Sequence, residues 1–149
     1  MVAILAIVFI VVIWAICIKS KMNNDMTMVT EEQSYFGFPQ PIILKNNKVK
    51  LVQVSINYFV MNVGKVNQSR SAGIDPVRRL ELEGIQFFRN SAADIEDETA
   101  LNNNQKDLES KLKTLLFESG LNQGIEVIDV MIKIGEKSDF NEFKENVGE

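Results

Sequence analysis

The chain has 149 residues, a formal net charge of −4, no histidine and a single cysteine, Cys17. The negative charge argues against nucleic-acid binding, which requires clustered excess Lys and Arg. The lack of histidine excludes a Ser-His-Asp triad and Cys/His zinc sites, and one cysteine excludes an intrachain disulfide framework. Only carboxylate, Lys or Tyr chemistry remains for catalysis. We therefore expect no enzyme, no cofactor and no metal.

An unbroken apolar run extends from Val2 to Ile18 and contains no charge, Pro or Gly. At about 1.5 Å per residue such a helix just crosses a bilayer core. A cleaved signal peptide needs a basic start and a small-residue cleavage site, which Trp14–Cys17 does not provide. A core helix is the other alternative, but a helix that is apolar on every face is typical of membranes. We predict a transmembrane anchor over residues 1–20.

Residues 21–40 are predicted to be a linker, polar in its first part and aromatic in its last. The stretch from Tyr35 to Pro41 contains two prolines, which exclude a helix and favour an extended path. Tyr35, Phe36 and Phe38 place three aromatic side chains in four positions. They indicate either a lid packed on the domain core or a contact surface for a partner close to the membrane.

Residues 41–136 are predicted to form one soluble domain that begins with a β-hairpin. Ile42–Leu44 is a short strand, Asn46-Asn47 is a turn pair, and Lys48–Val60 is a long strand. Apolar and polar residues alternate in the long strand, which predicts one buried face. The buried residues are expected to be Val52, Val54, Ile56 and Tyr58. Residues 62–73 are predicted to be a polar loop.

Two helices are predicted next. Asp75 is a good N-cap and Pro76 suits the first helical position, so a helix should run from there to about Arg89. The second helix is expected from about Thr99 to Glu118, with Gly120 as its left-handed cap. Its apolar stripe consists of Leu108, Leu112, Leu115 and Leu116. The acidic segment between the helices is predicted to be a solvated loop, because it lacks the spacing of a calcium site.

A final strand is predicted before a flexible tail over residues 137–149. Its apolar face is expected to consist of Ile128, Val130, Ile132 and Ile134. The predicted fold class is therefore α+β, with a single N-terminal transmembrane helix followed by one small domain in the order β-β-α-α-β.

This order resembles the FliL family of flagellar basal-body proteins. The resemblance lies in the order of the elements and in local sequence texture across most of the chain, and five segments carry it. They are Val49–Ile56, Ile74–Arg79, Ser91–Ile95, Leu108–Phe117 and Val127–Ile134. Members of that family have one N-terminal membrane helix and a periplasmic domain of the stomatin/prohibitin type.

The resemblance implies a non-enzymatic accessory of the bacterial flagellar motor in the inner membrane. The implied partners are further copies of the chain in a homo-oligomeric ring, the flagellar stator subunits and the lipid bilayer. It also implies a single-pass protein with its soluble domain in the periplasm. The positive-inside rule, applied to Lys19 and Lys21, favours the opposite orientation.

A membrane tether confines copies to a plane, so weak lateral contacts suffice for a ring. The residues that we expect at partner or oligomer contacts are Tyr35, Phe36, Phe38, Arg78 and Arg79. The alternative is a membrane-tethered binding or assembly module of another envelope or secretion system. A ligand-binding module would need a pocket of several hundred Å³ with converging polar groups.

Overall fold

The computed structural model describes residues 29–143, so the anchor predicted over residues 1–20 lies outside the described residues. The α+β class is confirmed, with strands first, then three helices, then a strand. The elements are β1 (Val29–Tyr35), β2 (Gln40–Ile43), β3 (Val49–Val60), α2 (Val63–Ser71), α3 (Pro76–Ala92), α4 (Glu98–Asn122), β4 (Ile125–Gly135) and the 3₁₀ helix η1 (Lys137–Phe143). Within this described range, no helix combines the length and the apolar character needed to span a bilayer.

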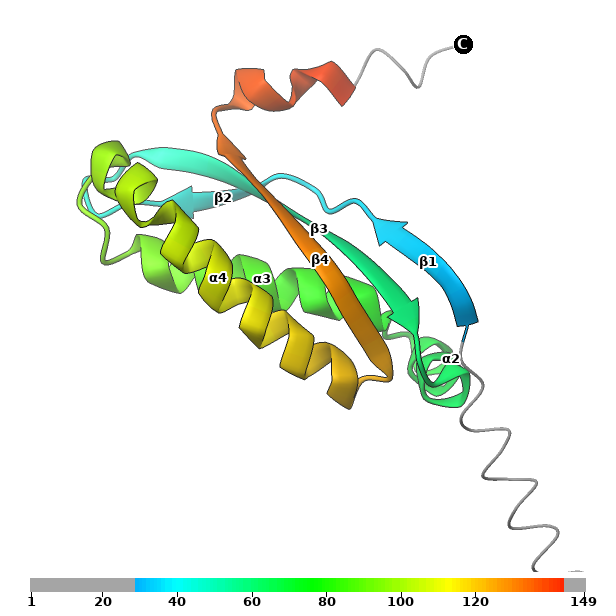
Figure 1. Ribbon diagram of the computed structural model, residues 1–149. Helices are drawn as coiled ribbons and strands as arrows, with labels where there is room; N and C mark the ends of the chain where they lie inside the picture. The colour runs from blue at the N-terminus through cyan, green and yellow to red at the C-terminus, as the bar shows by residue number, and fades with distance from the viewer. Residues whose placement is uncertain (1–28, 144–149) are drawn as a thin grey trace, which may run out of the picture.

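The sheet is antiparallel and is built around the long strand β3 (Figure 1). β4 pairs with β3 from Leu51 to Val60, along nearly its whole length. The other side of β3 is shared, with β2 beside its first residues and β1 beside its last. The connection between β1 and β2 therefore lies at the sheet edge near the middle of β3. This places the aromatic stretch of the sequence beside the centre of the sheet.

The hydrophobic core lies between one face of the sheet and the helices α3 and α4, which run side by side across that face (Figure 1). The predicted alternation in β3 is confirmed, because Val52, Val54, Ile56 and Tyr58 are all buried. The leucine stripe of α4 is confirmed in part. Leu108, Leu112 and Leu116 are buried, whereas Leu115 is 39% exposed.

The local signals at the hairpin and at the start of α3 are confirmed. β2 pairs antiparallel with β3, and Asn47 in the connecting turn has a φ of 64°, in the left-handed region that Asn tolerates. Pro76 is the first residue of α3, and the Asp75 side chain accepts a hydrogen bond from the Val77 N–H at 3.4 Å. Short-range capping chemistry therefore determines where this helix begins.

Three segments that were predicted to be irregular form regular structure. Residues 29–35, inside the predicted linker, form β1, because β3 is long enough to pair with two strands along one side. Residues 63–71, predicted to be a loop, form α2, capped by the Asn62 side chain, which accepts from the Lys65 N–H at 2.9 Å. Residues 137–143, inside the predicted tail, form η1, where Phe140 is buried. The predicted order thus lacked one strand, one α-helix and one 3₁₀ helix.

The end of α4 also differs from the prediction. The helix continues through Gly120 to Asn122, and the glycine with a positive φ beyond its end is Gly124, at +81°. Gly120 has a different role. A Cβ there would lie 2.9 Å from Val127 Cγ2 and 3.0 Å from the Ile125 carbonyl oxygen, so glycine permits close approach of α4 to β4.

The register of β4 shifts by one residue within the sheet. Val130 lies opposite Ile56, but Val127 lies opposite Tyr58, so Ile128 is the extra residue of a bulge. The predicted apolar face is correct for Val130, which is buried, and wrong for Ile128, which is 45% exposed. On the N-terminal side of the bulge, the residues of β4 that face the core are Val127 and Ile125. The prediction assumed strict alternation along the strand, which does not reveal this shift.

Candidate functional site

Glu81 on α3 is the one charged side chain that is fully buried among the described residues. A buried carboxylate is costly unless it is paired and hydrogen-bonded. Glu81 Oε2 accepts a hydrogen bond from the Tyr35 hydroxyl at 2.7 Å and pairs with Arg78 one turn earlier on α3. Its Oε1 accepts from the Phe38 N–H at 2.9 Å. Both carboxylate oxygens are therefore used, and they fix the connection between β1 and β2 to the helix.

We call residues 36–39, which make this connection, the aromatic loop. Its Gly37 is pressed against the sheet and α3. A Cβ at Gly37 would lie 2.1 Å from the Val54 carbonyl oxygen and 2.8 Å from Glu81 Oε1, so no other residue fits without displacement. The Gly37 carbonyl accepts a hydrogen bond at 2.7 Å from the buried side chain of Gln53 on β3. The backbone of the loop is thus held by both α3 and β3.

The two phenylalanine rings of the aromatic loop project outward from this fixed backbone. Phe36 is 61% exposed and Phe38 is 64% exposed, the two largest values among the exposed large apolar side chains. The guanidinium carbon of Arg78 lies 5.8 Å from the centroid of the Phe38 ring, within the range of a cation–π contact. One arginine therefore serves both the buried carboxylate and an exposed ring.

A hollow of about 180 Å³ lies between the aromatic loop and η1. It is lined by Phe36, Gly37, Phe38, Pro39, Gln53 and Phe140. Lys133 on β4 holds η1 in place, since its Nζ lies 4.9 Å from the Phe140 ring centroid and donates to the Asp139 carbonyl at 2.5 Å. The lining is largely aromatic, so this part of the surface suits an apolar group.

The electrostatics of the site favour the neutral form of Tyr35. Burial, together with the hydrogen bond to Glu81, raises the pKa of the Tyr35 hydroxyl above its ordinary value. Hydrogen bonds to Tyr35 and Glu81 raise the pKa of Arg78 as well. At neutral pH the tyrosine is therefore a hydrogen-bond donor and the arginine a cation.

Four of the five residues that the sequence suggested as contact residues meet at this site. Phe36 and Phe38 are displayed to solvent, while Tyr35 and Arg78 hold the loop that carries them. Arg79 does not join them. It pairs instead with Glu83 one turn later on α3, with Nε 3.6 Å from Glu83 Oε1.

Sequence reasoning missed Glu81, the residue that organises the site. A signal for it was present in the spacing of α3. The buried positions of that helix include Val77, Leu80, Gly84, Ile85 and Phe88, and Glu81 occupies a position of the same stripe. A carboxylate in an otherwise apolar stripe, three residues after an arginine, predicts a buried ion pair.

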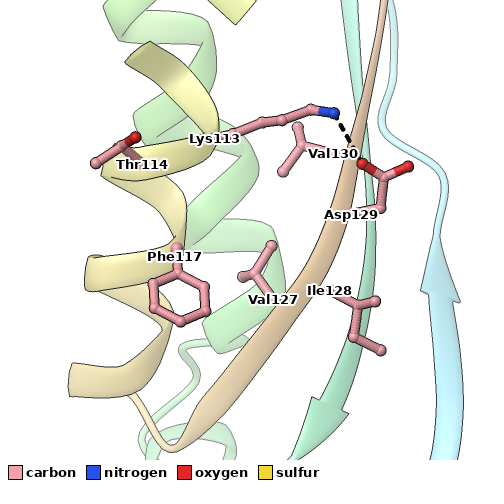
Figure 2. Close-up of a pocket in the computed structure, with 7 residues that line it drawn as sticks. All are labelled: Lys113, Thr114, Phe117, Val127, Ile128, Asp129 and Val130. Carbon is pink, nitrogen blue, oxygen red and sulfur yellow. Dashed lines mark hydrogen bonds and ion pairs between the residues drawn. The ribbon is translucent and has the colours of Figure 1, made fainter. Parts of the chain in front are cut away.

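A second hollow of about 280 Å³ lies between α4 and β4, and we call it the α4–β4 groove (Figure 2). Its lining residues are Lys113, Thr114, Phe117, Val127, Ile128, Asp129 and Val130. Figure 2 shows Lys113 reaching across from α4 to β4, where its Nζ lies 2.9 Å from Asp129 Oδ1. This hydrogen bond lowers the pKa of the Asp129 carboxyl. The Lys113 ammonium and the Asp129 carboxylate, the two charged groups that line the groove, therefore pair with each other.

The acidic segment before α4 is an exposed loop at Asp94, Glu96 and Asp97, as predicted, and some of its carboxylates also form ion pairs. Asp97 caps α4 by accepting a hydrogen bond from the Ala100 N–H at 2.9 Å. Glu96 pairs with Lys45, and Glu98 pairs with both Lys48 and Lys50. Over residues 29–143, His, Cys, Asp and Glu side chains form no group of three or more that is arranged to hold a metal ion.

Comparisons with known proteins add no assignment to this geometry. Neither the protein-family models nor the curated proteins give a match to this chain.

Proposed function

We propose that this chain is a membrane-tethered, non-enzymatic assembly protein whose aromatic loop contacts a neighbouring protein. One observation carries the proposal: two largely exposed phenylalanines stand on a loop that a buried carboxylate fixes in place. Aromatic side chains dominate the energetics of protein interfaces. A contact surface that is ordered before binding loses less conformational entropy on association.

A lid over the core is the other function that these aromatic residues suggested. A lid would bury its rings, and burial of a phenylalanine stabilises a fold by about 1.5–3 kcal/mol. Phe36 and Phe38 are instead more than half exposed, so their burial contributes little to folding. The residues that close the core at this edge are Tyr35 and Gly37. This supports a division between residues that fix the aromatic loop in place and exposed residues that contact a partner.

The cellular role that we propose follows the FliL resemblance. In it, the run from Val2 to Ile18 anchors the chain in the bacterial inner membrane, and the domain lies in the periplasm. Copies of the chain associate with one another and with flagellar stator subunits. Confinement to a plane supports such a role, because it raises the effective concentration of weakly interacting domains.

The decisive experiment measures self-association of the full chain in detergent by sedimentation over a concentration series. The variant Phe36→Ser/Phe38→Ser removes both exposed rings of the aromatic loop. Phe117→Ser is the matched control, because Phe117 is a 45% exposed phenylalanine outside the loop. We expect the double variant to associate at least tenfold more weakly than the wild type, which corresponds to about 1.4 kcal/mol, and the control to be unchanged.

A strict monomer of the wild-type chain, in detergent and in lipid nanodiscs alike, would contradict self-association. Equal weakening by Phe117→Ser would contradict the assignment to the aromatic loop. Co-purification with stator subunits from bacterial membranes separates the flagellar role from the alternative of another envelope or secretion system. A reporter fused after Glu149 decides between the periplasmic and the cytoplasmic orientation.

A further inference from the structure

The first described residue, Val29, lies at one end of the sheet. Val29 pairs with Val60, the last residue of β3, and Val60 pairs with Ile125, the first residue of β4. The N–H groups of Met61 and Asn62 donate to the Gly124 carbonyl at 2.9 and 3.0 Å. The start of β1, the start of α2 and the turn between α4 and β4 therefore lie together at this end, as Figure 1 also shows.

The sequence limits how far this end can lie from a bilayer that holds the apolar run. Residues 19–28, ten in number, separate Ile18 from Val29. Ten residues span at most about 36 Å when fully extended. β3 alone, with 12 residues, is about 40 Å long. If the apolar run is held in a bilayer, the end with Val29 lies within about 36 Å of it, and the turn between β2 and β3 lies at the opposite end of the domain.

The segment 61–74, which contains α2 and its flanks, has a composition unlike that of the rest of the chain. It carries Lys65 and Arg70 and no acidic residue, although the net charge of the chain is −4. Lys65 is exposed and makes none of the ion pairs found among residues 29–143, while Arg70 lies 3.7 Å from Asp75 Oδ1. Asp75 follows the segment directly, so the segment and this flanking residue together carry two cationic side chains and one carboxylate.

Apolar side chains are exposed on the same segment and beside it. Met61 is 38% exposed and Ile74 is 46% exposed, and Leu121, on the last turn of α4, is 46% exposed. The carboxylates near this end are Asp75, which pairs with Arg70, and Glu126, the second residue of β4, which lies opposite Phe59. Exposed apolar groups beside lysine and arginine are the combination that favours binding to an anionic lipid surface.

We infer that the end of the domain formed by segment 61–74 rests on the headgroups of an anionic bilayer. The inference depends on the membrane tether of the proposed function. It adds an orientation to that function, with α2 at the lipid surface and the long axis of β3 pointing away from it. The proposed contact surface, the aromatic loop beside the middle of β3, would then stand above the headgroups, where a neighbouring tethered domain can reach it.

The test uses the full chain with its one cysteine replaced, Cys17→Ser, and a single new cysteine that carries an environment-sensitive fluorophore. Met61→Cys reports on the proposed lipid face. Asn46→Cys, in the exposed turn between β2 and β3, is the matched control at the opposite end of the domain. Each protein is reconstituted into phosphatidylcholine vesicles with and without phosphatidylserine, and quenching by spin-labelled lipid is measured.

We expect the label at position 61 to be blue-shifted and quenched in vesicles that contain phosphatidylserine, and the label at position 46 to behave as it does in water. Lys65→Glu in the Met61→Cys background should lower the equilibrium constant for docking about fivefold or more, because each basic residue near an anionic surface contributes about that factor. Far-ultraviolet circular dichroism of each variant establishes that the domain is folded.

The outcomes separate this inference from the proposed function. If the chain fails to float with vesicles, the tether is wrong, and the proposed function fails with it. If it floats but position 61 is as aqueous as position 46, the lipid face is wrong and the assembly function stands. Equal quenching at both positions, or quenching that does not require phosphatidylserine, also overturns the inference.

Discussion

The aromatic loop and the α4–β4 groove both expose phenylalanine, but they differ in what lies beneath it. In the loop, a fully buried Glu81 accepts hydrogen bonds from a side chain and from the backbone, so the exposed rings have a fixed base. In the groove, Phe117 projects from the regular helix α4, and one half-exposed ion pair bridges to β4. Exposure alone therefore does not distinguish a contact site from ordinary surface. We propose that the buried support beneath the rings is what makes the aromatic loop a contact site.

The largest expected effect comes from removing the support of the loop. Glu81→Ala leaves the Tyr35 hydroxyl and the Phe38 N–H without their acceptor and Arg78 without its counter-ion. We expect a loss of about 3 kcal/mol in the free energy of unfolding, somewhat moderated because Arg78 can be rehydrated. Urea unfolding of the full chain in detergent, followed by circular dichroism, measures it. Glu118→Ala, at an exposed position of α4, is the control. If Glu81→Ala lowers the free energy of unfolding by less than about 0.5 kcal/mol more than this control does, the role of Glu81 is refuted.

The next effect separates the position of the loop from the chemistry of its rings. Gly37→Ala changes neither phenylalanine, but its Cβ would overlap the Val54 carbonyl oxygen, so the loop must move. We expect a loss of about 2 kcal/mol in stability and weaker self-association. In Gly84→Ala the new Cβ would lie 3.4 Å from its nearest neighbour, Leu112 Cδ1, and the helix gains a better helix former. That control should be neutral or stabilising, and unchanged association of Gly37→Ala would show that the fixed loop position is irrelevant.

Much of the fold follows from local rules, and the exceptions have identifiable causes. The capped start of α3 and the alternation in β3 are sequence signals that tertiary contacts reinforce. By contrast, α2 buries only Val66 and so has no apolar stripe to detect. β1 contains polar residues at positions such as Glu31 and Glu32, and it is a strand because β3 offers it a free edge. A strand of this kind is specified by its partner rather than by its own sequence.

The candidate site likewise combines features that the local sequence reveals with features that depend on tertiary contacts. Tyr35, Phe36, Phe38 and Arg78 are visible in the sequence, since aromatic clusters and arginines are typical of interfaces. Which of them hold the loop and which are exposed on it could not be predicted, because that depends on Glu81 being buried between α3 and the loop. Burial of a charged residue requires partners from distant parts of the chain, and here the partner hydroxyl lies 46 residues away in sequence.

A smaller effect is expected from the hydroxyl group of Tyr35, and it depends on pH. Burial and the hydrogen bond to Glu81 raise the pKa of Tyr35 in the folded chain above its ordinary value of about 10. The folded state therefore holds this proton more tightly than the unfolded state. The corresponding stabilisation is complete below about pH 10 and is lost as the pH rises through the raised pKa.

Tyr35→Phe should therefore cost about 1 kcal/mol at neutral pH and reduce the loss of stability in alkali. Burial raises the pKa of Tyr58 too, and these are the two tyrosines of the chain, so phenolate absorbance reports on both. In the native protein the phenolate signal should appear above the pH at which it appears in urea. A native titration that coincides with the one in urea would show that Tyr35 is not held by Glu81.

The smallest effect on stability is expected from removing the ion pair that joins α4 and β4 across the α4–β4 groove. Lys113 and Asp129 are each about half exposed, with side-chain values of 50% and 51%, and exposed pairs typically contribute at most about 1 kcal/mol. Lys113→Ala should therefore change stability by less than about 0.5 kcal/mol and leave self-association unchanged. Lys111→Ala, which removes an exposed pair with Asp107 within α4, is the matched control.

The effect of Lys113→Ala on stability depends on pH in a defined direction. The hydrogen bond from Lys113 lowers the pKa of Asp129 in the folded chain, so the pair stabilises the fold above the ordinary carboxyl pKa, and this contribution disappears as the pH falls through the lowered value. The difference between Lys113→Ala and wild type should accordingly vanish in acid, and carboxyl NMR should find the pKa of Asp129 raised in the variant. A loss of association in Lys113→Ala as large as that in Phe36→Ser/Phe38→Ser would mean that the groove is a contact site, and that a buried support is not what sets the aromatic loop apart.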